Sequence, residues 1–467
     1  MERSENRDYR PEMHFTPKKG WTNDPNGLFL KDGVWHLFAQ HNPLSPKWNV
    51  GMHWLHATSK DLLTWKDQGL ALAPEEKLGS IFSGSAVIDC GNTSGLGKGG
   101  DPIVLMYTSH GEYEQQSIAY SNDGMHFIPY SGNPVIPNTE KIDFRDPKVF
   151  RNDILDCWTV VLAAGDHVEF YASKDLIHWD KTGEFGREEK GLGGIFECPD
   201  LFPLRTEDGE EYWILMSSML LTFDFGGSRT QYFVGEFDGR TFRQTVSAPN
   251  PLMVDSGYDN YAQTTFFGTS DKLMMGWAAN PGYAGVVPTG EYRGLMTYAR
   301  RLSLVKTKCG IRLAGKPVAP ESSLTAHFSV PQGRTPEGWM KPEKAEAKLK
   351  GELFNIRVET DGPFVLVLSN PEGDILRVAL DNSHQFTVDR SESGIKDFSD
   401  LYESGLMSVA KTERLLDGPV TLDLYFDHMI AEIFADEGTF ANTTLVFPKE
   451  PYTEVALLGS GTLWTED

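Results

Sequence analysis

A short pattern recurs four times in the first half of the chain, and it constrains the fold more than any other feature. Each copy has a small or hydroxyl residue, then an Asp-led turn, then an aromatic residue; the copies span 58–65, 120–127, 172–179 and, more loosely, 235–242. Their Asp residues are 62, 52 and 63 positions apart. A turn that ends one strand and an aromatic residue that opens the next are expected of the outer hairpin in a repeated four-stranded unit.

A second recurrence runs out of phase with the first. Polar residues followed by an apolar strand begin near Asp24, Ser83, Asp146, Glu197 and Tyr261. No amphipathic helix of three turns is evident before residue 315, so the pattern predicts an all-β fold with an N-terminal five-bladed β-propeller. A sandwich with repeated Asp turns is the alternative. In a propeller, the innermost strands of all blades begin around one end of a central channel, so residues remote in sequence converge there.

The composition changes after Arg312. The stretch 316–350 is rich in Pro, Lys, Glu and Ser, which is typical of a linker, with room for one short helix. Short alternating strands resume near Leu353 and favour a C-terminal β-sandwich. We therefore expect a propeller over 1–315, a linker over 316–350 and a sandwich over 351–467.

Charge and targeting signals narrow the partners. The formal net charge is −23, so a nucleic acid or an anionic membrane would be repelled. No apolar run approaches the roughly 20 residues of a membrane helix. The first seven residues carry no hydrophobic segment, so no signal peptide is expected; the location would be cytoplasmic, or secreted if a leader has been removed. The sequence does not predict the oligomeric state.

Cofactor and metal signatures are weak. The four cysteines form no CxxC pair and are expected to be reduced and structural. His53 and His56 are three positions apart, which in a strand places them on opposite faces. No glycine-rich phosphate loop, Cys/His cluster or nucleotide fingerprint is present, so we expect no cofactor and no metal.

Three carboxylates stand at the starts of inner-strand segments: Asp24, Asp146 and Glu197. Asp24 and Asp146 are each followed by Pro, which predicts an extended backbone at the Asp. Taken singly, an Asp-Pro pair is more often a turn or a strand cap. Together, in a funnel rich in aromatic residues, three acids match the need of glycoside hydrolysis for one ionised and one protonated carboxyl group.

The motifs around these acids resemble those of glycoside hydrolase family 32, the β-fructofuranosidases, invertases and inulinases. Residues 21–27 read WTNDPNG, similar to the family signature W-x-N-D-P-N-G, and 145–147 and 197–200 resemble its R-D-P and E-C-P-D motifs. Residues 40–43 and 82–87 match further blocks, while 389–394 and 432–434 resemble the family's sandwich domain. The resemblance covers essentially the whole chain.

The resemblance implies roles for these residues. Asp24 would be the nucleophile and Glu197 the acid/base, while Arg145 and Asp146 would hold the fructosyl hydroxyls. Asp146 would also stabilise the transition state, and Arg145 should keep it ionised. Asp200 is expected to order a turn rather than to act in catalysis. The candidates for lining the fructose pocket are Asn23, Gln40, Trp48, Trp54, Phe82 and Ser83.

The implied activity is a retaining β-fructosidase that hydrolyses terminal non-reducing β-D-fructofuranosyl residues of sucrose and fructo-oligosaccharides, with inulin and levan as further substrates. The run 277–289 is similar to the exo-inulinase and levanase branch, which predicts release of single fructose units. Pro281, Thr22 and Leu55 depart from the usual family residues, and Pro281 and Thr22 are expected to loosen the leaving-group side of the pocket.

Three other functions remain open at this point. A fructosyltransferase, including one that forms difructose anhydrides, would use the same carboxylates. An inverting arabinanase-like enzyme would share the five-bladed architecture. A non-catalytic fructan-binding protein would release no reducing sugar from sucrose or inulin, which separates it from the enzymes.

Overall fold

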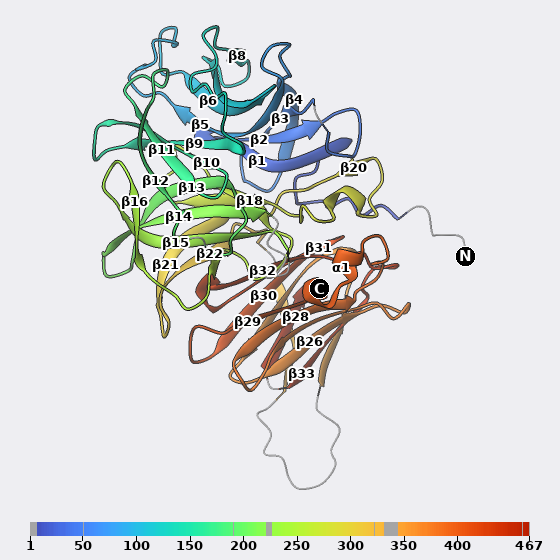
Figure 1. Cartoon of the computed structure of the whole chain (residues 1–467). Coiled ribbons are helices and arrows are strands. Elements are labelled where there is room, and N and C mark those ends of the chain that lie inside the picture. Colours follow the sequence, from blue (N-terminus) through green and yellow to red (C-terminus); the bar gives the residue numbers. More distant parts are fainter. Residues whose placement is uncertain are drawn as a thin grey trace, which may run out of the picture.

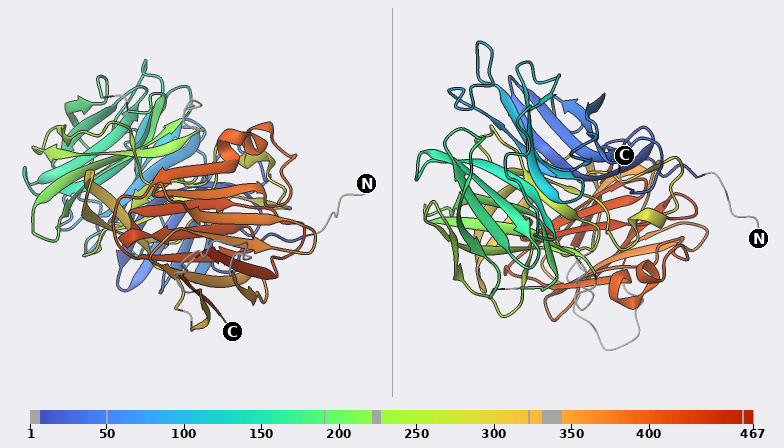
Figure 2. Two further views of the ribbon diagram at one scale, coloured as in Figure 1. Left: turned by 90° about the horizontal axis from the view of Figure 1, so that it is seen from below. Right: turned by 45° about the horizontal axis from the view of Figure 1, so that its top comes forward.

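The computed structural model describes residues 7–49, 51–189, 191–220, 227–321, 323–330, 344–459 and 461–466. It has two β-rich units, with the propeller above the sandwich in Figure 1, and Figure 2 shows the same two units from below and from above. The prediction of an all-β propeller followed by a sandwich is confirmed. Among the described residues, no helix is long and apolar enough to cross a membrane.

The propeller consists of five sheets, the blades, each built on four strands, and blades 1 and 4 gain a short fifth strand. Blade 1 contains β1 (Gly20–Lys31), β2 (Val34–Asn42), β3 (His53–Ser59) and β4 (Trp65–Leu72), with β20 (Tyr292–Arg293) beside β1. Blade 2 contains β5 (Ser80–Ile88), β6 (Ile103–His110), β7 (Glu114–Ser121) and β8 (Ile128–Pro129). Blade 3 contains β9 (Phe144–Asn152), β10 (Cys157–Ala164), β11 (Val168–Ser173) and β12 (Asp180–Phe185). Blade 4 contains β13 (Ile195–Arg205), β14 (Glu211–Leu220), β15 (Arg229–Phe237) and β16 (Phe242–Val246), and β17 (Leu252–Met253) pairs with β15. Blade 5 contains β18 (Tyr261–Thr265), β19 (Leu273–Trp277), β21 (Arg300–Thr307) and β22 (Gly310–Pro317).

The recurrent Asp turns lie between the third and fourth strands of their blades, as predicted. In blade 1, Asp61 Oδ1 accepts hydrogen bonds from the backbone N–H groups of Leu63 (2.9 Å) and Thr64 (2.7 Å). Asp123, Asp175 and Asp238 accept the corresponding pair of bonds in blades 2, 3 and 4. The Asp side chain thus satisfies two turn N–H groups that would otherwise lack partners, which explains its recurrence.

The sandwich has two six-stranded antiparallel sheets. One has the order β23 (Leu324–Val330), β34 (Gly461–Glu466), β25 (Leu353–Thr360), β30 (Val420–Asp427), β31 (Ile430–Ala435) and β32 (Phe440–Leu445). The other has the order β24 (Lys344–Lys348), β33 (Glu454–Gly459), β26 (Phe364–Ser369), β27 (Ile375–Leu380), β28 (Gln385–Glu392) and β29 (Val409–Glu413). The described short helices are α1 (Asp400–Glu403), α2 (Gly405–Ser408) and the 3-10 turns Ala284–Val286 and Asp436–Gly438.

The predicted linker is wrong in its described part. Instead of a helix, the stretch 316–350 contains β23, which pairs with β34, and β24, which pairs with β33, so the sandwich begins before residue 351. Residues 331–343 lie outside the described residues. The strand partners are more than 100 positions away, so the local Pro- and Lys-rich composition concealed strands that tertiary pairing creates.

Buried charges join the two units. Arg300 of blade 5 bonds Asp255 of the propeller (2.7 Å) and Glu432 of the sandwich (2.7 Å). Arg390 of the sandwich pairs in the opposite direction, with Asp259 of the propeller. Both arginine side chains are 1 % exposed, so these pairs fix the relative position of the units while hidden from water.

His14 adds a pH-dependent bond to the same interface. Its Nδ1 lies 2.8 Å from Asp427 Oδ2 and its Nε2 lies 3.2 Å from Glu432 Oε1. Burial alone would lower the pKa of His14, but hydrogen bonds to Asp427 and Glu432 outweigh it and raise the pKa to about 9. Burial would raise the pKa of each acid, yet the pKa of both is lowered, chiefly by His14 at Asp427 and by Arg300 at Glu432.

We expect this bond to make stability fall at alkaline pH. Because the pKa of His14 is higher in the folded state than the usual 6.5, its contribution is complete below pH 6.5 and is lost as the pH rises through about 9. The total is about 3 kcal/mol. Denaturant titrations at a series of pH values measure it. A His14→Gln variant should lack this part of the decline, and an identical decline in that variant would contradict the assignment.

Candidate active site

The five inner strands share an irregularity at the same end of the channel. The pairing register shifts at Asn23/Pro25 in β1, Ile81/Gly84 in β5, opposite Val161/Ala163 in the partner of β9, Glu197/Asp200 in β13 and Tyr261/Thr264 in β18. These register shifts have the form of β-bulges, which re-aim side chains next to active sites. They bring the predicted carboxylates to one mouth of the channel.

The backbone at the bulges differs from the sequence prediction. Asp24 has φ 42° and Asp146 has φ 62°, both in the left-handed region, so the prediction of an extended backbone before Pro is wrong. Cys198 (φ 44°) and Ala262 (φ 52°) adopt the same conformation in β13 and β18. Non-glycine residues reach this region only when the surrounding structure holds them there. Here the bulge geometry overrides the local preference.

Asp24 is held by donors on neighbouring strands. Its Oδ2 accepts from Ser83 Oγ (2.6 Å) and from Gln40 Nε2 (3.1 Å), and Gln40 Nε2 also lies 2.6 Å from Ser83 Oγ. Asn23 supports the same carboxylate and is itself fixed by Trp21, whose Nε1 donates to Asn23 Oδ1 (2.6 Å). Burial raises the pKa of Asp24, and these donors offset only part of the rise. One oxygen is thus fixed by the protein.

Glu197 lies between a cation and a phenol. Arg145 Nη2 donates to Glu197 Oε1 (2.9 Å) and Tyr261 OH donates to Glu197 Oε2 (2.6 Å). Burial raises the pKa of Glu197, whereas the charge of Arg145 and the hydroxyl of Tyr261 lower it, and burial dominates. Arg145 is in turn held by Glu114 (3.2 Å) and Asp143 (2.5 Å).

Asp146 completes the group. The Cys198 N–H donates to Asp146 Oδ2 (3.0 Å), and Cys198 Sγ lies 3.6 Å from that oxygen and 3.7 Å from Asp24 Oδ2. The nearest contact with Arg145 is 4.0 Å, from Nε to Asp146 Oδ2. Burial raises the pKa of Asp146; Arg145 opposes it, but Glu197 and Asp24 reinforce it. Arg145 therefore acts in the predicted direction on the pKa of Asp146, but burial and the two neighbouring acids act against it.

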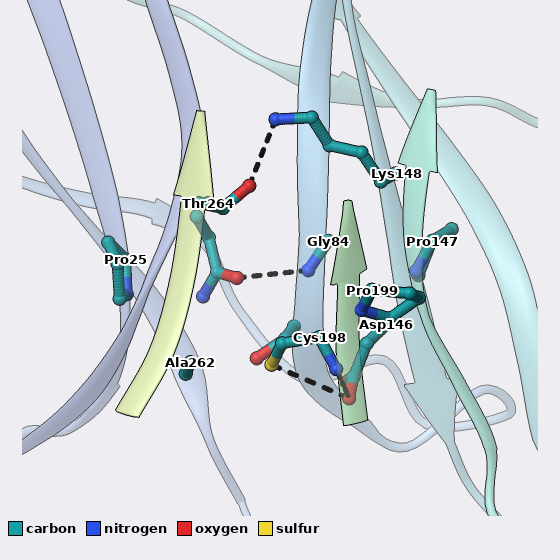
Figure 3. A pocket seen from close by; sticks show the side chains of 11 residues that line it. Pro25, Gly84, Asp146, Pro147, Lys148, Cys198, Pro199, Ala262 and Thr264 are labelled. Atoms are coloured by element: carbon teal, nitrogen blue, oxygen red, sulfur yellow. Dashed lines mark hydrogen bonds between the residues drawn. The ribbon is translucent and has the colours of Figure 1, made fainter. Parts of the chain in front are cut away.

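The channel closes directly beneath the carboxylates. A cavity of about 10 Å³, about the room of one water molecule, is lined there by residues of all five inner strands. Figure 3 shows Asp146 and Cys198 toward one end of it and the Lys148–Thr264 bond toward the other. Lys148 Nζ donates to Thr264 Oγ1 (2.9 Å) and pairs with Asp200 (3.0 Å). A cavity of this size has no room for a sugar unit.

Asp200 lies away from the carboxylates and links blades. It is fully buried, and its Oδ2 accepts from the Thr265 N–H (2.7 Å) and Oγ1 (2.9 Å) in addition to pairing with Lys148. The prediction that it has no catalytic position agrees with this placement. Its structural role is a contact between β13, β18 and β9 rather than the ordering of a neighbouring turn.

Aromatic rings form one wall of the mouth. Phe82 stacks on His110 with ring centres 4.3 Å apart, and Trp48, which is 48 % exposed, meets Phe82 edge-on at 6.0 Å. Trp54 differs from the other predicted pocket residues because it is completely buried. Its Nε1 donates to the Phe82 carbonyl (2.9 Å), so it positions the wall from behind.

Two of the unusual residues also lie away from the opening. Thr22 is completely buried and its hydroxyl donates to the Gln40 carbonyl (2.8 Å), so the prediction that it loosens the edge of the pocket is wrong. Leu55 is buried in the apolar core of blades 1 and 5. Pro281 is partly exposed and precedes the 3-10 turn Ala284–Val286.

Four site residues carried no functional assignment from sequence. Tyr261 was recognised only as the start of a strand, and Cys198 only as a motif letter. Glu114 and Asp143, which hold Arg145, lie outside every motif. The recurrence of a polar residue at the start of each inner strand indicates Tyr261, because Tyr261 has in β18 the position that the carboxylates have in β1, β9 and β13. No local signal identifies Glu114, since it reaches the site from β7.

Among the described residues, one cluster has the ligand types of a metal site: His167, Glu169 and Glu184. Its acceptors are already used by cations of the protein. Lys181 Nζ lies 2.7 Å from Glu169, and Arg187 bonds both Glu184 (2.7 Å) and His167 Nε2 (2.9 Å). His53 and His56 do not meet, since their ring nitrogens contact the Gly51 carbonyl and His36 respectively.

The chain matches two family models in sequence. Residues 14–317 match the model described as glycosyl hydrolases family 32 N-terminal domain, and residues 323–465 match glycosyl hydrolases family 32 C terminal. A levanase of Bacillus subtilis (strain 168) is 37 % identical over 463 residues, covering 94 % of this chain and 67 % of the relative. An extracellular exo-inulinase of Meyerozyma guilliermondii is 34 % identical, covering 94 % of this chain and 90 % of the relative.

The fold is similar to solved structures over nearly its whole length. The structure of β-fructofuranosidase from Schwanniomyces occidentalis complexed with fructosyl-erythritol superposes with a TM-score of 0.86 at 28 % sequence identity. The match covers 98 % of this chain and 97 % of that chain. The similarity therefore includes the propeller mouth and the sandwich together.

Proposed function

Because the chain belongs to glycosyl hydrolase family 32, a family whose levanase, exo-inulinase and β-fructofuranosidase members it resembles, we propose that it is a retaining β-fructosidase acting on sucrose and fructans. The observation that carries the mechanism is the meeting of three carboxyls, two of them buried and Glu197 partly exposed, at one end of the channel. Cys198 Sγ lies within 3.7 Å of both Asp24 and Asp146, and its neighbour is Glu197. The fructosyltransferase alternative is not favoured.

In the proposed first step, Asp24 attacks the anomeric carbon of a terminal fructosyl unit while Glu197 gives its proton to the departing glycosidic oxygen. A fructosyl ester of Asp24 forms and an alcohol leaves. Burial favours the protonated form of Glu197 that this step needs. Ser83 and Gln40 occupy Asp24 Oδ2, which leaves Oδ1 as the attacking atom.

In the second step, Glu197 accepts a proton from water, and the water oxygen displaces Asp24 from the anomeric carbon. Because two displacements occur, free fructose is released with the β configuration retained. Both carboxyls then have the protonation states with which they began. Asp146 and Arg145 flank Glu197 and are proposed to bind the fructosyl hydroxyls, and Asp146 in its ionised form is proposed to stabilise the developing positive charge. Asn23, Phe82 and Trp48 form the surrounding wall.

The acid role of Glu197 predicts a pH effect at Tyr261. The Tyr261 hydroxyl lowers the pKa of Glu197, so Tyr261→Phe should raise that pKa. Glu197 then stays protonated to higher pH, and the alkaline limb of kcat/KM on sucrose should move upward. A pH profile measures the shift, with Tyr130→Phe as the control. An alkaline limb that does not move would assign the acid to another group.

Product analysis tests which end of the fructan chain is cleaved, and it also separates hydrolysis from transfer and from binding alone. The cavity at Lys148 has no room for a further sugar unit, so single fructose units should be the sole early product from inulin and levan. Early time points separated by chromatography decide the matter. A ladder of oligomers would show endo action, and a difructose anhydride or lengthened oligosaccharides would show transfer. No reducing sugar from any fructoside would leave only binding.

A further inference from the structure

A second groove lies on the sandwich, on the outward face of the sheet that contains β25, β30 and β34. Its volume is about 580 Å³, within the range of small-ligand sites. The floor alternates along the strands, because Ile356 and its apolar neighbours point into the sandwich core while Asn355, Arg357 and Glu359 point outward. The chain at 319–321 and Leu324 forms the side wall.

Two aromatic rings stand on this polar floor. Tyr425 pairs with Asn355 across the strands, and Trp464 pairs with Arg357. Trp464 is partly exposed, yet its Nε1 atom is buried and has no hydrogen-bond partner among the described residues. A buried indole N–H usually finds an acceptor, so one at the edge of a groove that has no partner among the described residues is available to a ligand in the groove.

The charges of the groove define what fits. Arg357 is neutralised by Asp423, since Nε lies 2.6 Å from Oδ1. With Glu321 and Glu359 also in the lining, acids outnumber the one arginine, and this excess of negative charge repels phosphates, nucleic acids and acidic peptides. What remains favoured is a neutral molecule with one apolar face for the rings and many hydroxyls for the carboxylates and Trp464. A saccharide has this chemistry, because its C–H bonds form flat apolar patches between hydroxyl edges.

We propose that this groove binds a few sugar units of the fructan chain, separately from the active site, and so holds polymeric substrate to the enzyme. The identity of the sugar rests on the proposed function. Binding requires no covalent step, and the propeller mouth stays free to cleave chain ends. Sucrose, which is too short to occupy both sites, should gain nothing from the groove.

Native electrophoresis through gels that contain levan, inulin or dextran tests the proposal, with Glu197→Gln present to stop hydrolysis. Trp464→Ala should weaken retardation by levan or inulin at least about fivefold. Trp464→Phe keeps a ring without the N–H and should fall between Trp464→Ala and the parent. Leu406→Ala, an exposed apolar change elsewhere on the sandwich, is the matched control and should behave as the parent.

Activity provides the second readout, in chains that retain Glu197. Trp464→Ala and Trp464→Phe should keep kcat/KM on sucrose while kcat/KM on the polymer falls. Equal retardation in all variants would overturn the proposal that the groove binds fructan. Retardation by dextran as well would also overturn it. Retardation that high salt abolishes would overturn it too, because it would indicate a charged ligand. A parent that is inactive on every fructoside, but whose retardation still depends on Trp464, would overturn the proposed function and leave the saccharide site standing.

Discussion

Asp24→Asn and Glu197→Gln should each lower kcat on sucrose by at least roughly a thousandfold, which corresponds to about 4 kcal/mol of barrier. Each replacement nearly preserves the size of the side chain, and the partners of each side chain are fixed from neighbouring strands, so the fold should survive. Initial-rate measurements check the loss. Asp175→Asn makes the same chemical change in an outer turn and is the control, for which near-normal turnover is expected.

The two acids can be told apart by chemical rescue. Azide should restore turnover to Glu197→Ala on an aryl fructoside, because a good leaving group needs no acid and azide attacks the fructosyl ester without a base. The product would be a fructosyl azide with retained configuration. Asp24→Ala lacks the group that forms the ester, so azide should not give that product. Near-normal activity in either variant without azide would show that the wrong residue is assigned.

Arg390→Met should destabilise the chain by roughly 3–5 kcal/mol, because it leaves Asp259 charged and buried without its cation. Arg390 also donates to the Met407 carbonyl (3.0 Å) and to Tyr283 OH (3.0 Å), so several acceptors lose their partner together. Denaturant unfolding measures the loss. Adding Asp259→Leu should recover much of it, since a buried pair replaced as a whole costs far less than a broken one.

Arg243→Met is the matched control for that experiment. Arg243 also pairs with an acid, Glu236, but its side chain is 71 % exposed. Exposed pairs contribute about 0–1 kcal/mol, so this variant should unfold close to the parent. Equal losses at Arg243 and Arg390 would mean that burial of the interface pair is not what makes it important.

Much of the fold was predictable because the signals that define it are local and repeated. Each Asp turn is formed by hydrogen bonds within three residues, as at Asp61, so four copies can be recognised without knowing what surrounds them. The polar residues that precede each apolar inner strand predicted five blades for the same reason, since each start can be recognised locally. The strands β23 and β24 were missed because their partners are at the far end of the chain, and no short window contains both members of either pair.

For the site, too, the local motifs were predictable and the long-range contacts were not. The acids of β1, β9 and β13 stand in recognisable motifs, and the structure brings all three to one mouth. The rise in the pKa of Asp146 was not predicted, because sequence proximity to Arg145 does not say where the guanidinium points. It points mainly to Glu197, Glu114 and Asp143. Trp54 was placed in the pocket on the family resemblance, although it packs in the apolar core between blades 1 and 2.

The bulges of the inner strands have a consequence for insertions and deletions. A bulge contains one residue more than the opposite strand, so removing one residue near Pro25 would restore regular pairing of β1 with β2 and abolish the left-handed backbone that aims Asp24 into the mouth. Length changes should therefore be tolerated in the outer hairpins and rejected within the first few residues of each inner strand, even where no catalytic group is touched.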